Sequence, residues 1–176
     1  MGIRLARKNL PRNLLIAALF LLALAPGRVV AGQSATPPPA WVATWAASQQ
    51  IPEPQNSLAA ADLQDVTLRQ IVHLSVGGAT LRIHLSNAFG TEPLHFTSVH
   101  IARPLSPASP AIDPASDKAL SFSGSSDVTV PAGAEYISDP IDYAVAPLSN
   151  LAISFHLDTP PAQPTGHPGS RATSYY

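Results

Sequence analysis

Serine and histidine are the residue types in this sequence that could carry out nucleophilic chemistry. A serine hydrolase needs a serine held on a tight turn, a histidine base within hydrogen-bond reach and donors for the oxyanion. The 176-residue chain has six histidines, but it has no Gly-x-Ser-x-Gly elbow and no Gly-Asp-Ser block. The remaining candidates are Ser125 and Ser126 in SGSSD, and His167 with Ser170 in GHPGS. Both stretches are typical of turns, so we predict no catalytic residue here.

Carboxylates are the second group with possible chemistry, because glycoside hydrolysis needs only an acid and a base. Glu92, Asp139 and Asp142 are the candidates. Their spacing selects no pair, and Asp139 precedes a proline, which favours a turn. The sequence also contains no phosphate-binding glycine loop, no His-Glu-x-x-His and no calcium-loop pattern. We therefore predict no cofactor.

Two tryptophans in WVATW suggest a different function. Trp41 and Trp45 are four residues apart, so on a strand they would share one side. Such aromatic residues can line a sugar-binding face, and they can equally be buried in a core or between domains. We favour burial.

The stretch Thr67 to Asn87 gives the clearest prediction of local structure. Apolar and polar residues alternate on both sides of Gly77-Gly78, which is typical of half-buried strands joined by a two-residue turn. A hairpin with this turn would place Val76 opposite Ala79, Leu74 opposite Leu81 and Val72 opposite Ile83. All these apolar residues would then lie on one face.

The same hairpin would place His73 opposite Arg82, with His84 diagonal to His73. A metal or anion site could use these groups, but the sequence offers no third metal ligand nearby. We therefore predict a solvated face and no metal site.

Further short strands are predicted along the chain. They cover His95–Arg103, Ser126–Pro131, EYISDPIDY and Leu151–Leu157, and a last one begins at Ser174–Tyr176. The connection from Pro104 to Lys118 is predicted to be a surface loop or a crossing between sheets. No segment after the first 31 residues has helical apolar spacing. The predicted fold class is all-β, a β-sandwich or jelly-roll-like domain.

The N-terminus has the pattern of a secretory signal peptide. Basic residues precede an apolar run from Leu14 to Ala25, and small residues follow, so we predict cleavage after Ala31. The run is shorter than the ~20 residues that span a bilayer. The predicted organisation is a signal peptide over 1–31, a Pro-rich spacer over 32–40 and a β-sandwich domain over 41–176 that is truncated at its C-terminal end. The protein would be secreted or periplasmic.

Charge and composition exclude several partners. Beyond residue 31 five basic residues face eleven acidic ones, a net charge of −6. Such a chain has no basic surface that would attract nucleic acid. The same negative charge disfavours binding to anionic membranes after signal cleavage. The chain has no cysteine, which excludes thiolate chemistry and disulfides.

Three stretches resemble a known family. They are WVATWAAS at Trp41–Ser48, LRQIVHLSVGGATLRIHLSNAFGTEPL at Leu68–Leu94, and VPAGAEYISDPIDYAV at Val130–Val145. Together they resemble the N-terminal region of exported bacterial SGNH/GDSL-type esterases. The resemblance implies a β-domain that precedes a hydrolase domain, whose Gly-Asp-Ser block carries the nucleophile.

The resemblance transfers no catalytic residue to this chain. Asn87 in SNAFG lacks the context of that family's oxyanion asparagine. The expected function is an accessory β-domain, not catalytic alone, of a secreted serine esterase or acylhydrolase whose C-terminal hydrolase domain is missing from this sequence, with an ester substrate. The alternative is a stand-alone exported carbohydrate-binding or adhesive β-sandwich.

Overall fold

The computed structural model describes residues 40–176. The predicted signal peptide and, except for Ala40, the predicted spacer lie outside the described residues. The described chain consists of antiparallel strands and three short 3-10 helices, which confirms the all-β prediction. The jelly-roll variant of that fold stays a prediction. Among residues 40–176, none of the helices could span a bilayer.

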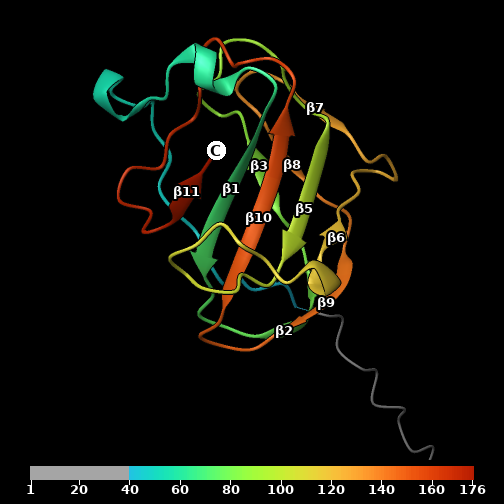
Figure 1. Cartoon of the computed structure of the whole chain (residues 1–176). Coiled ribbons are helices and arrows are strands. Elements are labelled where there is room, and N and C mark those ends of the chain that lie inside the picture. The colour runs from blue at the N-terminus through green and yellow to red at the C-terminus, as the bar shows by residue number, and fades with distance from the viewer. Residues whose placement is uncertain (1–39) are drawn as a thin grey trace, which may run out of the picture. The chain divides into compact units, whose positions relative to one another are not determined.

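A five-stranded antiparallel sheet, here called the main sheet, forms one layer (Figure 1). Its strand order is β11-β1-β10-β5-β6. The central strands β1 and β10 have eight residues each and pair along their whole length, from Val66 opposite Leu157 to His73 opposite Asn150. The strands of this sheet are β1 (Val66–His73), β5 (Ser98–Ala102), β6 (Lys118–Ala119), β10 (Asn150–Leu157) and β11 (Thr173–Tyr175).

Three two-stranded pairs form the second layer. β2, β3 and β4 follow one another along the chain, and their partners β9, β8 and β7 do so in reverse order. The three pairs therefore make one interrupted antiparallel ribbon, here called the ribbon, from Gly78 opposite Val145 to Phe96 opposite Val128. Its strands are β2 (Gly78–Leu81), β3 (His84–Ser86), β4 (Leu94–Phe96), β7 (Val128–Val130), β8 (Glu135–Ile137) and β9 (Ile141–Val145).

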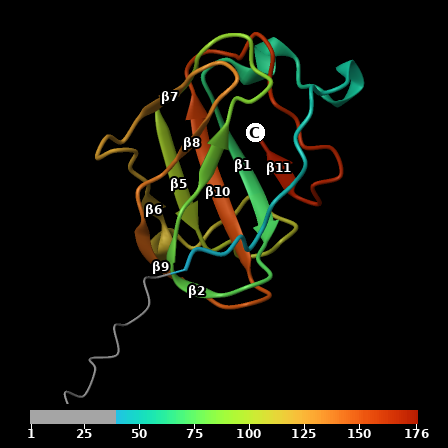
Figure 2. The ribbon, with the colours of Figure 1, turned by 180° about the vertical axis from the view of Figure 1, so that it is seen from behind.

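One hydrophobic core fills the space between the main sheet and the ribbon. Figure 1 shows ribbon strands behind β1, β10 and β5, and the reverse view in Figure 2 shows them in front. Ile101 and Leu151 contribute from the main sheet, Val130 and Leu85 from the ribbon, and all four are buried. Because both layers line the same core, we expect them to stabilise each other.

The predicted hairpin at Gly77-Gly78 is wrong. β1 pairs with β10 and β11, while β2 pairs with β9, so the two segments belong to different layers. A type I′ turn would need positive φ at both glycines, and neither has it. Gly77 serves a close approach instead, since a Cβ there would lie 2.7 Å from the carbonyl oxygen of Val145. The alternation of apolar and polar residues predicts which side of a strand faces the core, but it does not predict which strands pair.

Most of the other predicted strands are present. β10 occupies Leu151–Leu157, β7 lies within Ser126–Pro131, and β11 overlaps the last predicted strand. The predicted strand at His95–Arg103 divides into β4 and β5, because the chain leaves the ribbon at Thr97 and enters the main sheet. The three 3-10 helices lie in segments for which no strand was predicted. They are η1 (Pro54–Asn56), η2 (Ala60–Leu63) and η3 (Pro114–Ser116).

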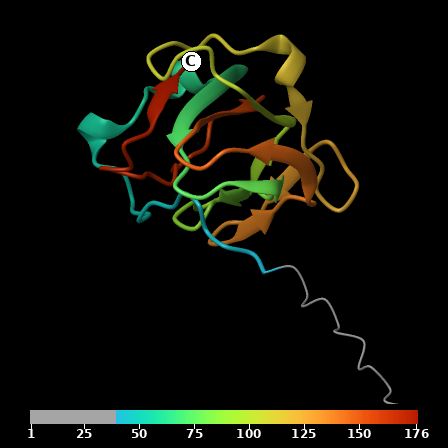
Figure 3. The same ribbon diagram turned by 90° about the horizontal axis from the view of Figure 1, so that it is seen from below.

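The segment 104–117, here called the strap, is a surface loop between two paired strands of the same sheet, β5 and β6. It covers part of the outer face of the main sheet, the face turned away from the ribbon (Figure 3). There Ile112 packs against a small apolar cluster formed by Ile71, Ala102 and Ala152. Beside the strap, two polar rows of this face stay accessible.

Candidate functional site

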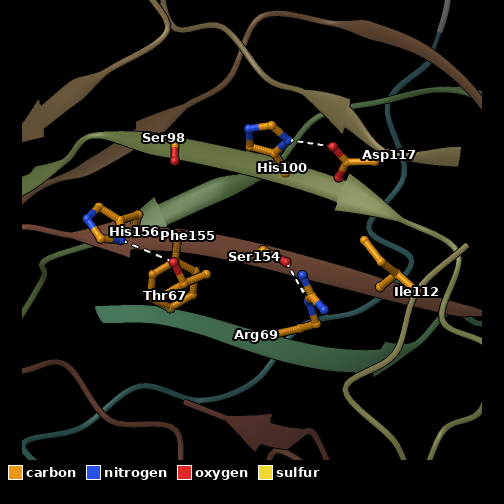
Figure 4. Close-up of a pocket in the computed structure, with 9 residues that line it drawn as sticks. All are labelled: Thr67, Arg69, Ser98, His100, Ile112, Asp117, Ser154, Phe155 and His156. Atoms are coloured by element: carbon orange, nitrogen blue, oxygen red, sulfur yellow. Dashed lines mark hydrogen bonds and ion pairs between the residues drawn. The ribbon is translucent and has the colours of Figure 1, made fainter. Parts of the chain in front are cut away.

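Polar side chains form two rows across three adjacent strands on the outer face of the main sheet. The register places Thr67 opposite His156 and His156 opposite Ser98, and in the next row Arg69 opposite Ser154 and Ser154 opposite His100. Cross-strand partners share a face, so each row runs unbroken over β1, β10 and β5. These residues line a pocket of about 270 Å³ together with Ile112, Asp117 and Phe155 (Figure 4). We call it the outer-face pocket.

Arg69 is the cation of this pocket, and two bonds hold it. Its Nε donates to the hydroxyl of Ser154 at 2.8 Å, and its Nη1 donates to the Pro110 carbonyl of the strap at 2.5 Å. Arg69 is half-buried and Ser154 is buried. The guanidinium therefore joins the sheet to the strap and has a fixed orientation.

His156 is held at both ring nitrogens. Its Nδ1 lies 3.1 Å from the Thr67 hydroxyl, and its Nε2 lies 3.3 Å from the Asp65 carboxylate. Asp65 lies just before β1 and has a φ of 51°, a conformation that non-glycine residues rarely adopt. The turn that directs this carboxylate toward His156 is thus locally strained.

His100 forms a pair with Asp117. Its Nδ1 lies 2.9 Å from the Asp117 carboxylate, at the point where the strap meets β6. The imidazole is turned toward Asp117 and away from Ser154 (Figure 4). An imidazole oriented by a carboxylate could act as a base, but a nucleophile must lie on its free side. The Ser154 hydroxyl does not, so this arrangement favours binding over serine chemistry.

The predicted serine candidates have local structural roles in the described chain. The Ser125 hydroxyl donates to Asp127 at 2.6 Å, and Ser126 is exposed at the entry to β7. The backbone N–H of Ser170 donates to the carbonyl of His167 at 3.1 Å, so their closeness reflects a turn. None of these serines is hydrogen-bonded to a histidine side chain among residues 40–176.

His167 is set apart by its surroundings. Its ring meets that of Trp45 edge-on at 6.4 Å, and its buried Nδ1 has no hydrogen-bond partner within the described residues. Burial lowers the pKa of this imidazole, so the neutral form is favoured. His167 also lines a second hollow of about 410 Å³ between residues 50–56 and 166–169.

The three carboxylate candidates are not paired. The backbone N–H of Gly124 and then the hydroxyl of Ser121, each at 2.8 Å, lower the pKa of Asp139 and fix the loop before β7. Asp142 accepts from Thr80 across the ribbon, and Glu92 is exposed. The turn role expected of Asp139 agrees with these bonds.

The His73, Arg82 and His84 group does not assemble. His73 lies opposite Asn150 in the main sheet and contacts it at 3.0 Å, which corrects the predicted pairing with Arg82. His84 belongs to the ribbon and lies 4.0 Å from Glu135. Within residues 40–176 no group of three or more acidic, histidine or cysteine side chains could hold a metal ion.

The two tryptophans do not share a face of a strand, because residues 41–45 form no strand. Trp41 is 53% exposed, with the guanidinium of Arg82 4.8 Å from its ring centroid. Trp45 packs against the core. The favoured burial is therefore partial for Trp45, which is half-buried, and wrong for Trp41, which is held at the surface by a cation–π contact.

Asn87 has a structural role that its sequence context did not reveal. It is 1% exposed and lies at the break between β3 and β4. Its Nδ2 contacts three carbonyl oxygens, those of Glu92, Val130 and Pro131, at 2.8–3.2 Å. It thereby ties the loop after β3 to the turn before β8.

The residues of the outer-face pocket were missed by sequence reasoning. The alternation of polar residues could be seen within His95–Arg103 and Leu151–Leu157. The order of the paired strands, β1-β10-β5, could not be seen, since these strands are far apart in sequence. Only that order brings Arg69, His100 and His156 together. Predicting this pocket from the sequence would therefore have required knowing which distant strands pair.

Comparison with known proteins adds no family to these observations. No protein-family model and no curated protein matches the chain. Inference about function therefore rests on the residues, their geometry and the resemblance described above.

Proposed function

We propose that residues 41–176 are the accessory β-domain of a secreted SGNH/GDSL-type serine esterase and do not catalyse alone. One observation carries this proposal. Two of the stretches that resemble the family, Leu68–Leu94 and Val130–Val145, are separated in sequence but supply opposite strands of the ribbon. Much of the resemblance thus falls on strands that pair with each other, while Leu68–His73 belongs to β1 of the main sheet.

The contacts of the candidate nucleophiles support the same proposal. Ser125 is bonded to a carboxylate, Ser154 to a guanidinium, and His100 is turned away from Ser154. By resemblance, a separate hydrolase domain would supply the serine alkoxide, the histidine base and the aspartate that orients it. The β-domain would then support that domain or shape its substrate pocket.

An ester hydrolysis assay tests whether this chain is catalytic alone. The purified chain is incubated with p-nitrophenyl acetate and p-nitrophenyl butyrate, beside an active serine esterase as positive control. We expect no turnover above the buffer blank, because within residues 40–176 no serine hydroxyl is hydrogen-bonded to a histidine, and Ser121 and Ser125 donate to carboxylates instead. Turnover that a serine-directed fluorophosphonate abolishes would contradict the proposal.

Sequencing the coding DNA downstream of the Tyr176 codon, in all three frames, tests the association with a hydrolase domain. We expect a frame that encodes a Gly-Asp-Ser block, followed further on by an Asp and a His. A downstream region with none of these blocks in any frame would count against the association. This result is independent of the assay.

A further inference from the structure

The outer-face pocket has side chains that are fixed in place without a ligand. Arg69 is held by Ser154 and by Pro110 of the strap, and His156 is held by Thr67 and Asp65. Immobilising a long polar side chain on binding ordinarily costs conformational entropy. Here the protein's own contacts have already met much of that cost.

Several polar groups in the pocket still have hydrogen-bonding capacity. A guanidinium carries five N–H donors, and the contacts of Arg69 use two of them. The Ser98 hydroxyl makes no hydrogen bond within residues 40–176, and the His100 contact with Asp117 uses only Nδ1. Donors and acceptors therefore lie together on a surface about three strands wide (Figure 4).

The charges around the pocket exclude most classes of ligand. Asp65 and Asp117 place carboxylates beside it, and the chain beyond residue 31 carries −6, so a polyanion is repelled. Arg69 opposes a cation. A purely apolar ligand would leave the polar lining without water or partners, which is costly. A neutral polyhydroxyl compound can pair with both donors and acceptors at no charge penalty.

The dimensions suit a small, partly open site. The pocket volume of about 270 Å³ lies just below the roughly 300–1,000 Å³ typical of sites for drug-sized ligands. The side chains of His100 and Asp117 are 36% and 35% exposed. A ligand here would be covered on one side by the sheet and at one end by the strap, which suits a ring within a longer chain.

We propose that the outer-face pocket binds a neutral saccharide, with Arg69, Ser98 and His100 contacting its hydroxyl groups. This inference does not rest on the proposed association with an esterase. It also differs from the sequence-based carbohydrate hypothesis, which placed the sugar on Trp41 and Trp45.

Affinity electrophoresis of the purified chain tests this proposal. Native gels contain hydroxyethyl cellulose, soluble xylan, galactomannan or laminarin, with polygalacturonate as an anionic comparison. We expect at least one neutral polysaccharide to retard the chain. The single substitutions Ser98→Ala and His100→Ala should each weaken that binding about five- to tenfold, as expected when one hydrogen bond is removed.

His73→Ala is the matched control, because His73 lies on β1 and on the same face of the main sheet but outside the pocket. We expect it to bind like the parent chain, and thermal melting should show that all three variants remain folded. The proposal is overturned by no retardation in any neutral gel, by equal loss in His73→Ala, or by retardation in polygalacturonate alone. An unchanged affinity in both pocket variants would overturn it as well.

Discussion

The main sheet and the ribbon line the same core but are held together in different ways. In the main sheet β1 and β10 pair over eight consecutive residues, so backbone hydrogen bonds alone form a continuous ladder. The ribbon has three separate pairs, interrupted after β3 and after β8. At these interruptions buried side chains take over the bonds of the missing ladder. The ribbon should therefore depend on a few polar residues, and the main sheet should not.

Asn87→Asp should break the ribbon and has the largest expected effect. A buried carboxylate would replace the amide that faces three carbonyl oxygens, leaving them without a donor and adding charge repulsion. We expect a loss of about 3–5 kcal/mol in the free energy of unfolding. Urea denaturation followed by tryptophan fluorescence measures this loss.

Two further variants check that reason. Asn56→Asp makes the same change at an exposed position, where it removes the hydrogen bond to Glu53 and places two surface carboxylates together, and it should cost less than about 1 kcal/mol. Gly90→Ala should also destabilise the chain, because a Cβ at residue 90 would lie 1.7 Å from the Oδ1 of Asn87. Equal stability of Asn87→Asp and the parent chain would show that Asn87 does not hold the ribbon.

Matched truncations on the two sides of the core test whether both layers unfold together. Val99 in β5 and Val130 in β7 are at most 1% exposed and belong to the same core cluster. Val99→Ala and Val130→Ala should each cost about 2 kcal/mol, from lost apolar burial and the resulting cavity. Circular dichroism and fluorescence should report one coincident urea transition in both variants.

Separate transitions in Val130→Ala would contradict a shared cooperative core. They would show that the ribbon can unfold while the main sheet persists. The main sheet and the ribbon would then be two separate folding units, and not two layers of one unit that are stabilised in different ways.

Ser138→Ala probes the second interruption of the ribbon and should have a smaller effect. Ser138 is buried after β8, where its Oγ accepts from the backbone N–H of Ile83 at 3.0 Å and its own N–H donates to the carbonyl of Ile83. Alanine would remove the acceptor for Ile83 and the O–H donor to the carbonyl of Asp139, at 3.0 Å, but would keep the backbone bond, so we expect a loss of about 1–2 kcal/mol in the free energy of unfolding. Ser126→Ala, at an exposed serine, is the control, and an equal loss there would refute the assigned role.

The sequence predicted the strands better than it predicted their partners. Alternation identified β10 and the segments of β5, β7 and β11, because the period of two depends only on local burial. The hairpin at Gly77-Gly78 failed because two apolar faces that match locally can belong to different layers. Residues defined by long-range register, such as Arg69 with His100, could not be predicted for the same reason. Asn87 was visible in sequence, but its role depends on carbonyls more than forty residues away.

An ionic contact between the two layers gives the smallest predicted effect and a test by pH. His95 in β4 lies between Asp127, just before β7, and Asp158, just after β10, at 3.3 and 3.4 Å. The hydrogen bond to Asp127, followed by that to Asp158, raises the pKa of His95 above 6.5. The pKa of Asp127 is lowered by its bonds with Ser125 and His95, and that of Asp158 is lowered by His95, which outweighs desolvation.

These directions fix the pH range in which the contact stabilises the fold. The His95 contribution is complete below its unfolded-state pKa, near 6.5, and is lost as the pH rises through the higher folded-state pKa. The carboxylate contributions are complete above about 3.8 and are lost on acidification. Near pH 5 His95→Gln should therefore lower the melting temperature by about 1–3 °C, and at pH 8.5 by almost nothing. His73→Gln is the control, because within residues 40–176 the His73 ring pairs with the Asn150 amide and with no carboxylate, so its loss removes no ionic contact. A pH-independent effect of His95→Gln would mean that the ring joins the ribbon to the main sheet by packing rather than by charge.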